Sequence, residues 1–310
     1  MKEIHKSVLL QEAIDSLSLK EDDVAVDMTL GFAGHSSEIL KRIKKGYLFA
    51  FDQDSEVFTY SRNRLNAIGN NFELIHANFS EAKEELLKRN ITKVDAILYD
   101  LGVSSYQLDN KERGFSYNND AVLDMRMNRD NQLTAKIVVN TYSEQELTRI
   151  FKLYGESKFA RNIARNIVNK RKEKEINTTL ELVSIIKEAV PIKERLKKHP
   201  AKQIFQAIRI EVNKELDVLV SSLNDSLDLL NVGGRLAVIT FHSLEDKIVK
   251  DTFRKVSETD SLSKGLPNIP EDKLPNFKII TKKGIVPTDK EEAENHRAHS
   301  ARLRVIERIK

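Results

Sequence analysis

Three aspartates, Asp27, Asp52 and Asp100, each close a short apolar run of the kind that forms a buried strand. Because the carboxyl ends of parallel strands meet at one edge of a sheet, we expect these carboxylates in one crevice. Such a crevice suits a ligand with a positive charge and hydroxyl groups and does not suit a pyrophosphate. No lysine or arginine lies between Asp27 and Ile39 to neutralise phosphate, so the pattern favours S-adenosylmethionine over a nicotinamide dinucleotide.

The stretch VAVDMTLGFAGHSSEIL, residues 24–40, predicts a strand, a tight turn and a helix. Gly31 and Gly34 allow backbone to approach a ligand closely, although glycines that merely fit a crossover would give the same pattern. The next apolar run ends in Asp52, 21 residues after Gly31, where a carboxylate can accept both hydroxyls of a ribose. The order of strand, glycine turn, helix and acid-tipped strand predicts a nucleotide-binding corner.

The elements that position these residues alternate up to Asp100 and predict a parallel sheet wound on both faces. Ser36 or Ser37 is expected to cap a helix that begins near Glu38. Strands are expected at 24–28, 47–52, 72–76 and 94–100, and further helices at 1–20, 54–68 and 80–89.

The alternation stops after Asp100, and helical patterns dominate the middle of the chain. Residues 101–130 resemble a loop, helices are expected at 143–153, 157–172, 178–189 and 201–230, and strand character returns at 235–241. A helix at 244–256, a mobile loop at 257–275 and short strands at 277–281 and 302–309 complete the chain. We therefore expect an α/β domain of residues 1–108 and 212–310, interrupted by a helical domain of residues 109–211.

The composition excludes several classes of protein. The 310 residues include no cysteine, so disulfides and thiolate metal sites are excluded, and no metal is expected in the chemistry. No apolar run approaches the roughly 18 residues that cross a bilayer, and the N-terminal residues lack the apolar core of a signal peptide. The expected location is the cytoplasm, without membrane attachment.

The positive charge is concentrated in one segment. The formal net charge is +4, but the segment from Lys158 to Lys202 holds thirteen Lys and Arg against five Glu. A basic segment on a mildly acidic body indicates either a polyanionic partner or an ordinary solvated helical face. A nucleic-acid partner predicts an affinity that falls with salt.

Four segments resemble the bacterial ribosomal RNA small-subunit methyltransferase H family, the cytosine-N4 methyltransferases also called MraW. The segments are VDMTLGFAGHS (26–36), YDLGVSSYQLDNKERGFSYNNDAVLDMRM (99–127), HPAKQIFQAIRIEVNKEL (199–216) and GGRLAVITFHSLEDKIVK (233–250). Their order and spacing cover nearly the whole chain. The resemblance implies a Rossmann-like S-adenosylmethionine-dependent methyltransferase sheet with an inserted all-helical domain that helps to bind substrate.

The resemblance also implies a reaction, methyl transfer from S-adenosylmethionine to the exocyclic amine of a cytidine in the decoding region of 16S rRNA. Carried over by position, the cofactor-binding residues are Ala33, Gly34, His35, Asp52, Phe79, Asp100 and Gln107. Candidate contacts to the RNA are Ser104, Ser105, Arg113, Lys202, His242 and Arg297. The expected partner is the small ribosomal subunit or its RNA; no obligatory protein partner is evident, and a homodimer stays open.

A cytosine amine is a weak nucleophile, because its lone pair is delocalised into the ring. The amine must be held in line with the methyl group. A hydrogen-bond acceptor must also accept hydrogen bonds from its N–H groups as the nitrogen becomes tetrahedral. Asp100, or a backbone carbonyl of the turn 100–105, is the candidate acceptor. Met28, Phe32 and Ala33 stand where the family often has glycine, so Phe32 is expected to point away from the cofactor.

Three alternative functions are compatible with parts of the sequence. A DNA cytosine-N4 methyltransferase would share the cofactor chemistry, but such enzymes commonly carry D/N-P-P-Y/F/W after the fourth strand, where this chain has DLGVSS. A non-catalytic ribosome-assembly factor would bind RNA through the basic segment, although the cofactor corner argues against it. A nicotinamide oxidoreductase fits the glycine spacing and the acidic strand ends poorly.

Overall fold

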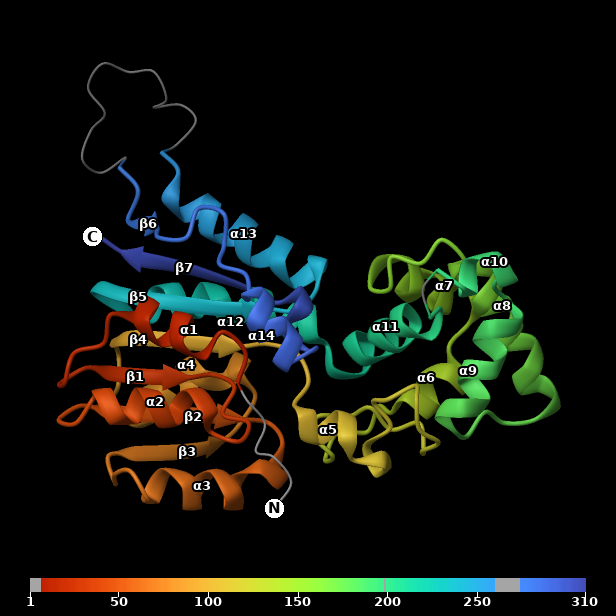
Figure 1. Cartoon of the computed structure of the whole chain (residues 1–310), viewed down its shortest axis with the longest axis horizontal. Helices are drawn as coiled ribbons and strands as arrows, with labels where there is room; N and C mark the ends of the chain where they lie inside the picture. The colour runs from red at the N-terminus through yellow and green to blue at the C-terminus, as the bar shows by residue number, and fades with distance from the viewer. Residues whose placement is uncertain (1–6, 198, 260–273) are drawn as a thin grey trace. The chain divides into compact units, whose positions relative to one another are not determined.

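The computed structural model describes residues 7–197, 199–259 and 274–310, so most of the loop expected at 257–275 lies outside the described residues. The chain divides into two compact units (Figure 1). The sheet unit is Met1–Gly102 together with Leu216–Lys310, and the helical unit is Val103–Glu215.

The described part of the sheet unit contains seven strands in the order β3-β2-β1-β4-β5-β7-β6. Their bounds are β1 Val24–Asp27, β2 Tyr47–Asp52, β3 Phe72–His76, β4 Val94–Asp100, β5 Leu230–Thr240, β6 Phe277–Ile279 and β7 Arg302–Arg308. The chain runs outward from β1 to β3 on one side and from β4 to β5 on the other, so the order reverses between β1 and β4. In open α/β sheets, ligands bind outside the carboxyl ends of the strands at such a reversal.

Strands β1 to β5 pair in parallel, whereas β7 is antiparallel to both β5 and β6. The predicted parallel sheet is therefore correct for five strands and wrong for β7. An antiparallel neighbour needs no helical crossover, and residues 280–301 between β6 and β7 contain only the short helix α14 (Asp289–Glu294) and one 3-10 turn.

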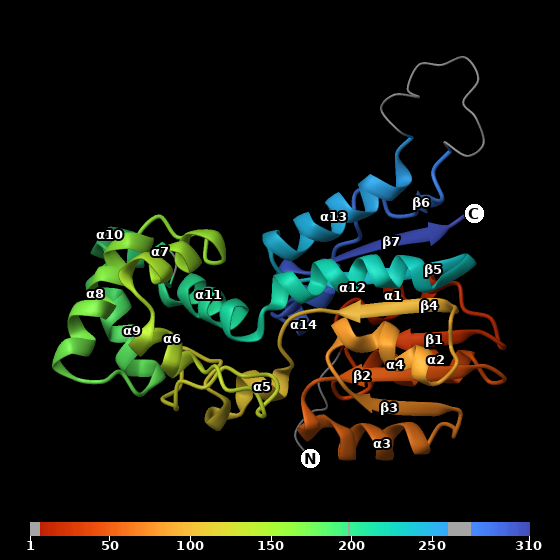
Figure 2. The same ribbon diagram turned by 180° about the vertical axis from the view of Figure 1, so that it is seen from behind.

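Alternate strand residues point to opposite faces, and each face is covered by helices. Ala25, Leu48 and Leu98 pack with α1 (Leu10–Leu17), α2 (Gly34–Arg42) and α3 (Phe58–Asn66). Val26, Phe49 and Ile97 pack with α4 (Ala82–Lys88), α12 (Glu215–Leu229) and α13 (Ser243–Ser257). The two helical layers are seen from opposite sides in Figures 1 and 2.

The helical unit has its own hydrophobic core, which includes Phe151, Ile163, Leu182 and Ile208. Its helices are α5 Ser105–Asp109, α6 Ala135–Thr141, α7 Glu144–Leu153, α8 Ala160–Glu173, α9 Thr179–Glu188, α10 Ile192–Arg195 and α11 Ala201–Asn213. Capping boxes fix the starts of α7 and α9, and both helices begin within a residue of their predicted positions.

One long helix expected at 201–230 is two helices. α11 ends at Asn213 because Lys214 adopts the left-handed conformation with φ 52°, and α12 then begins at Glu215. The seven-residue helix α6 lies in a stretch for which no helix was predicted. Among the described residues, none of the helices combines the length and apolar character that crossing a bilayer requires.

The boundaries of the helical unit differ from the predicted 109–211. Val103 and Leu108 pack against its core, and Val212 is one of the core residues. These contacts extend the helical unit to Val103–Glu215. Ser104 and Gln107, which were expected in the α/β domain, therefore belong to the helical unit.

Candidate functional site

The turn between β1 and α2 is built on left-handed backbone. Gly31 has φ +46°, and Ala33, the N-cap position of α2, has φ 58°. The helix begins at Gly34, so the predicted start near Glu38 is wrong. Neither predicted serine caps it: the hydroxyl of Ser36, inside the helix, donates a 2.6 Å hydrogen bond to Asp27. Asp27 is buried, and its other carboxylate oxygen accepts the N–H of Thr29 at 3.0 Å.

The missing side chain of Gly34 is required by packing within the protein. A Cβ at this position would lie 1.9 Å from the hydroxyl oxygen of Ser7. The segment that precedes α1 therefore lies directly against the start of α2. His35 follows and is only 4% exposed.

Helix α3 holds the turn from its outer side. The hydroxyl of Ser61 donates to the carbonyl of Gly31 at 2.7 Å, and the guanidinium of Arg64 donates to the carbonyl of Phe32 at 3.0 Å. The Phe32 ring meets the ring of Tyr60 edge to face, with centroids 5.2 Å apart. Two consecutive carbonyls and the Phe32 ring are thus engaged by α3, a role that the sequence analysis did not find.

Asp52 lies at the end of β2 and is tied to the turn. Its Oδ2 accepts the N–H of Gly31 and its Oδ1 accepts the N–H of Asp54, both at 2.8 Å. Burial raises the pKa of Asp52 to about 6, so the carboxylate is mostly ionised at neutral pH. Each oxygen has a further lone pair, which can accept a ligand hydroxyl.

Asp100 lies at the end of β4, across the point where the strand order reverses. Its N–H donates to the hydroxyl of Thr29 at 2.7 Å, and its Oδ2 lies 3.4 Å from Nδ1 of His35. Its other oxygen, Oδ1, is buried and accepts no hydrogen bond from any residue that the structure describes. Burial, followed by the negative charges of Asp27 and Glu245, raises the pKa of Asp100 to about 8.

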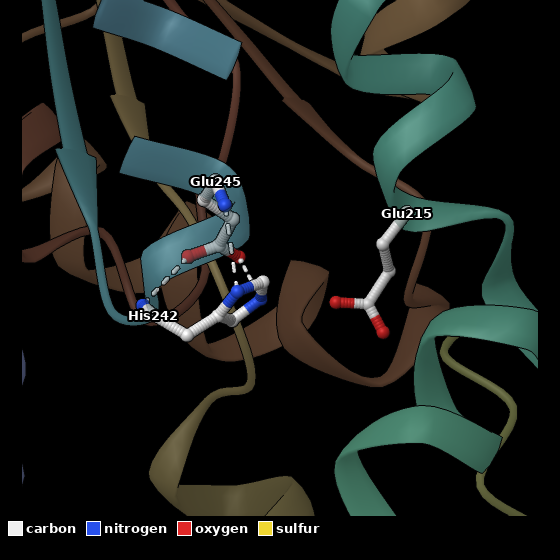
Figure 3. Close-up of side chains that lie close together, drawn as sticks. All are labelled: Glu215, His242 and Glu245. Carbon is white, nitrogen blue, oxygen red and sulfur yellow. Dashed lines mark hydrogen bonds and ion pairs between the residues drawn. The ribbon is translucent and has the colours of Figure 1, made fainter. Parts of the chain in front are cut away.

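The end of β5 contributes Glu245, which the sequence analysis did not select. Glu245 is 3% exposed and accepts the N–H of Phe241 at 2.8 Å. Figure 3 shows it beside His242: the N–H of Glu245 donates to His242 Nδ1 at 3.4 Å, and His242 Nε2 lies 3.1 Å from Glu245 Oε1. His242, predicted to contact RNA, thus caps helix α13, and the capping-box spacing was the available signal.

Phe79 follows β3 and is fixed by the opposite layer of helices. Its carbonyl accepts the hydroxyl of Ser222 at 2.9 Å, and its ring meets the Tyr99 ring edge to face at 5.5 Å. Just before it, the Asn78 amide donates to the side-chain oxygen of Gln53 at 2.9 Å, which ties the ends of β2 and β3 together.

The structure therefore brings together six of the predicted cofactor residues, all at or after the carboxyl ends of β1 to β4: Ala33, Gly34, His35, Asp52, Phe79 and Asp100. Their chemistry fits a cationic adenosyl ligand. The buried Oδ1 of Asp100 offers an acceptor for a positive group, and Asp52 offers acceptors for hydroxyls.

The seventh predicted residue, Gln107, belongs to the helical unit. Its N–H donates to the Ser104 hydroxyl at 3.2 Å, and its side-chain oxygen accepts the N–H of Ser104 at 3.1 Å. This capping box starts α5 at Ser105. Both predicted residues, Ser104 and Gln107, thus have a local role in the helical unit.

The other candidate RNA contacts differ in exposure. Arg113 is fully buried, and its guanidinium donates to the carbonyls of Arg126 and Met127, each at 3.0 Å. Its predicted contact with RNA is wrong for this structure, because it anchors a loop inside the helical unit. Lys202 is exposed on α11, and Arg297 is partly exposed beside the turn before β7.

Comparison with known proteins gives one consistent result. The model of the MraW methylase family matches residues 2–309. A ribosomal RNA small subunit methyltransferase H from Streptococcus mutans is 53% identical over 310 residues, which cover 99% of this chain and 98% of the relative. The proteins of the same name from Limosilactobacillus fermentum and Exiguobacterium sibiricum are 51% and 50% identical, with the same coverage.

Among solved structures, an rRNA methylase from Streptococcus thermophilus aligns with 99% of this chain and 99% of its own chain. Its sequence identity is 12% and its TM-score is 0.46.

Proposed function

The chain belongs to the MraW methylase family, and from this membership we propose that it methylates 16S rRNA with S-adenosylmethionine as the methyl donor. The proposed acceptor is the exocyclic N4 amine of a cytidine in the decoding region. The small ribosomal subunit or its RNA is the proposed substrate, and the cytoplasm is the proposed location.

The observation that carries the cofactor assignment is the set of carboxylates at the ends of β1, β2 and β4. Asp100 Oδ1 is buried without a hydrogen-bond partner among the described residues, and the neighbouring turn carries no lysine or arginine. A cationic group beside Asp100 satisfies this oxygen, whereas a phosphate would lie beside carboxyl groups with no lysine or arginine in the turn to neutralise it. We assign Asp100 to the cationic methionine part of the ligand and Asp52 to the ribose.

The residues of the turn position the cofactor and exclude water. When bound, S-adenosylmethionine supplies an activated methyl group on its sulfonium. We assign Ala33, Gly34 and His35 to the inner wall of the site and Phe79 to the border of the adenine. Because α3 holds the carbonyls of the turn, the wall is already formed without a ligand, so little ordering cost falls on binding.

Asp100 is the candidate acceptor for the amine of the target base. As the amine nitrogen becomes tetrahedral, its N–H groups acquire positive character and bind an anionic acceptor more strongly. The target base must leave its stack or lie in an unpaired region to reach such a site. Stabilisation of this kind is typically worth 10²–10³-fold in turnover for one well-placed group.

The test is transfer of labelled methyl groups to three acceptors taken from cells that lack the enzyme: small ribosomal subunits, free 16S rRNA and DNA. Nucleoside mass spectrometry would locate the label. We expect N4-methylated cytidine in the subunits or their RNA and none in DNA. Label in DNA alone would overturn the acceptor assignment and retain the cofactor site. Cofactor binding without transfer to any acceptor would favour a non-catalytic assembly factor.

A further inference from the structure

Helix α8, Ala160–Glu173, has one face that folding does not account for. Its inner face is apolar: Ala160, Ile163, Ala164 and Ile167 are buried in the core of the helical unit. Its outer face carries Arg161, Arg165 and Lys172, all exposed, and the exposed amides Asn162 and Asn169 lie to one side of them, about 80–100° from Arg161 around the axis. No acidic residue occurs in the helix before Glu173, its last residue.

The three cations lie on one line. At about 100° per residue, Arg165 and Lys172 lie within about 40° of Arg161 around the helix axis, and the row is about 16 Å long. The side chains of Arg161 and Arg165 are 72% and 54% exposed. We call Arg161, Arg165 and Lys172 the α8 row.

The nearest acid neutralises the row only in part. One carboxylate oxygen of Glu144 lies 4.0 Å from Nε of Arg161 and 3.8 Å from Nε of Arg165, so a single acid is shared between two guanidinium groups beyond hydrogen-bond distance. Other cations of the same helix and its end are directly paired: Lys174 lies 2.6 Å from Glu181, and Lys170 lies 3.4 Å from Glu188.

The positions of Arg161 and Arg165 oppose helix stability, whereas Lys172, in the last turn, lies where the helix dipole favours a cation. Arg161 lies in the first turn of α8, where the helix dipole favours acidic residues, and the first turn has none. Arg161 and Arg165 are also like charges four residues apart, an arrangement that destabilises a helix. Cations kept in an unfavourable position on an exposed face indicate an external anionic partner.

We propose that the α8 row is a docking surface for the phosphate backbone of the RNA substrate. The inference rests on the proposed function, because the polyanion it names is the methyl acceptor. Guanidinium and ammonium groups bind phosphate oxygens, and the asparagines beside the row can donate to phosphate or sugar oxygens. The row recognises charge and spacing, and it supplies affinity and orientation without selecting the base.

The test compares two variants of the full chain: R161Q/R165Q/K172Q, and the control K170Q. Lys170 lies on the same helix, about 180° from Arg161 around the axis, and is paired with Glu188. The measurements are the affinity for free 16S rRNA and for the small subunit between 50 and 200 mM salt, together with KM and kcat for the RNA. Each phosphate contact contributes about one unit to the slope of log affinity against log salt concentration.

For the triple variant we expect RNA affinity at least about 10-fold weaker, a salt slope smaller by about 2–3, and a KM for RNA raised more than kcat is lowered. Affinity for S-adenosylhomocysteine and the melting temperature should not fall. K170Q should behave as the wild type. RNA affinity within twofold of wild type, with an unchanged salt slope, would overturn the inference.

Two other outcomes also decide between explanations. Loss of binding to the assembled subunit, with binding to free RNA and its salt slope unchanged, would mean that the row contacts a ribosomal protein, and the inference would be wrong. If the wild-type chain methylates no RNA at all, the proposed function fails. An intact wild-type reaction with an unaffected triple variant is a failure of the α8 row alone.

Discussion

Two aspartates at opposite ends of β4 separate activity from stability. Asp95 accepts hydrogen bonds from the N–H of Val24 at 2.9 Å and from the side-chain amide of Asn231 at 2.7 Å. Asp95→Asn would place its own NH2 group against one of these N–H groups, and that hydrogen bond would be lost. Asp100 has a buried oxygen without such a partner and a raised pKa. Asp95→Asn should lower the free energy of unfolding by about 1–3 kcal/mol and retain turnover per folded molecule.

Asp100→Asn should do the reverse, with turnover lowered at least about 100-fold and unliganded stability at pH 8 unchanged or raised. The sign follows from the pKa. A carboxyl whose pKa is raised from 3.8 to about 8 by burial disfavours the fold progressively as pH rises between these values. Chemical denaturation and methyl transfer on both variants make the comparison. Near-normal turnover of Asp100→Asn would remove Asp100 from the chemistry.

The same pKa predicts how cofactor affinity depends on pH. Asp100 is largely protonated at pH 7, and a cation beside Oδ1 favours its ionised form. Binding of S-adenosylhomocysteine, through its ammonium group, should therefore release a proton, and the affinity should rise as pH increases from 6 to 8. Calorimetry in two buffers of different ionisation enthalpy measures the proton release. Asp100→Asn is the control; a pH dependence that persists in it must come from another group.

At the residue scale, the sequence predicted the acids at the strand ends and did not predict the groups that fix them. Asp52 and Asp100 were found because each closes an apolar run. Thr29 and Ser61 were missed because their contacts join segments 71 and 30 residues apart in the chain. Arg113 was misassigned because an arginine in a polar segment gives no sign that backbone carbonyls will bury it.

At the scale of elements, α3 should control cofactor affinity through the turn that it holds. Arg64→Gln removes the donor to the Phe32 carbonyl, which leaves that part of the wall freer to move. We expect the KM for S-adenosylmethionine to rise about 3–10-fold, the equivalent of one lost hydrogen bond, with kcat less affected. Arg62, exposed on the same helix, gives the matched control Arg62→Gln. An equal effect of both substitutions, or none from Arg64→Gln, would contradict this role.

The boundaries of a helix or strand were predicted correctly where neighbouring residues in the sequence define them. Strands β2, β3 and β4 have the predicted limits because apolar runs between polar residues define them. The start of α2 was predicted four residues late because Ala33, a residue without a capping side chain, occupies the N-cap in a left-handed conformation. The break at Lys214 has the same cause, since neither glycine nor proline marks it.

At the scale of the whole molecule, the insertion was visible where the strand pattern stops, but its limits depended on packing. Val103, Leu108 and Val212 join the core of the helical unit, and such a choice between two cores cannot be read from the residues themselves. Among the described residues, the core of the helical unit shares no member with the cores on the two faces of the sheet. Separate cores predict two separable unfolding transitions.

A ligand held by Asp52, Asp100 and the turn 31–35 should shift only one of these transitions. At 100 times its Kd, S-adenosylhomocysteine should stabilise the sheet unit by about 2.7 kcal/mol, and so raise its transition by about 5–10 °C. Differential scanning calorimetry with and without the ligand measures the shift, and a nicotinamide dinucleotide at equal concentration should cause none. If both transitions move, the helical unit also contributes to the site, and Gln107 is the residue to replace next. A shift with the dinucleotide would instead contradict the cationic site built around Asp100.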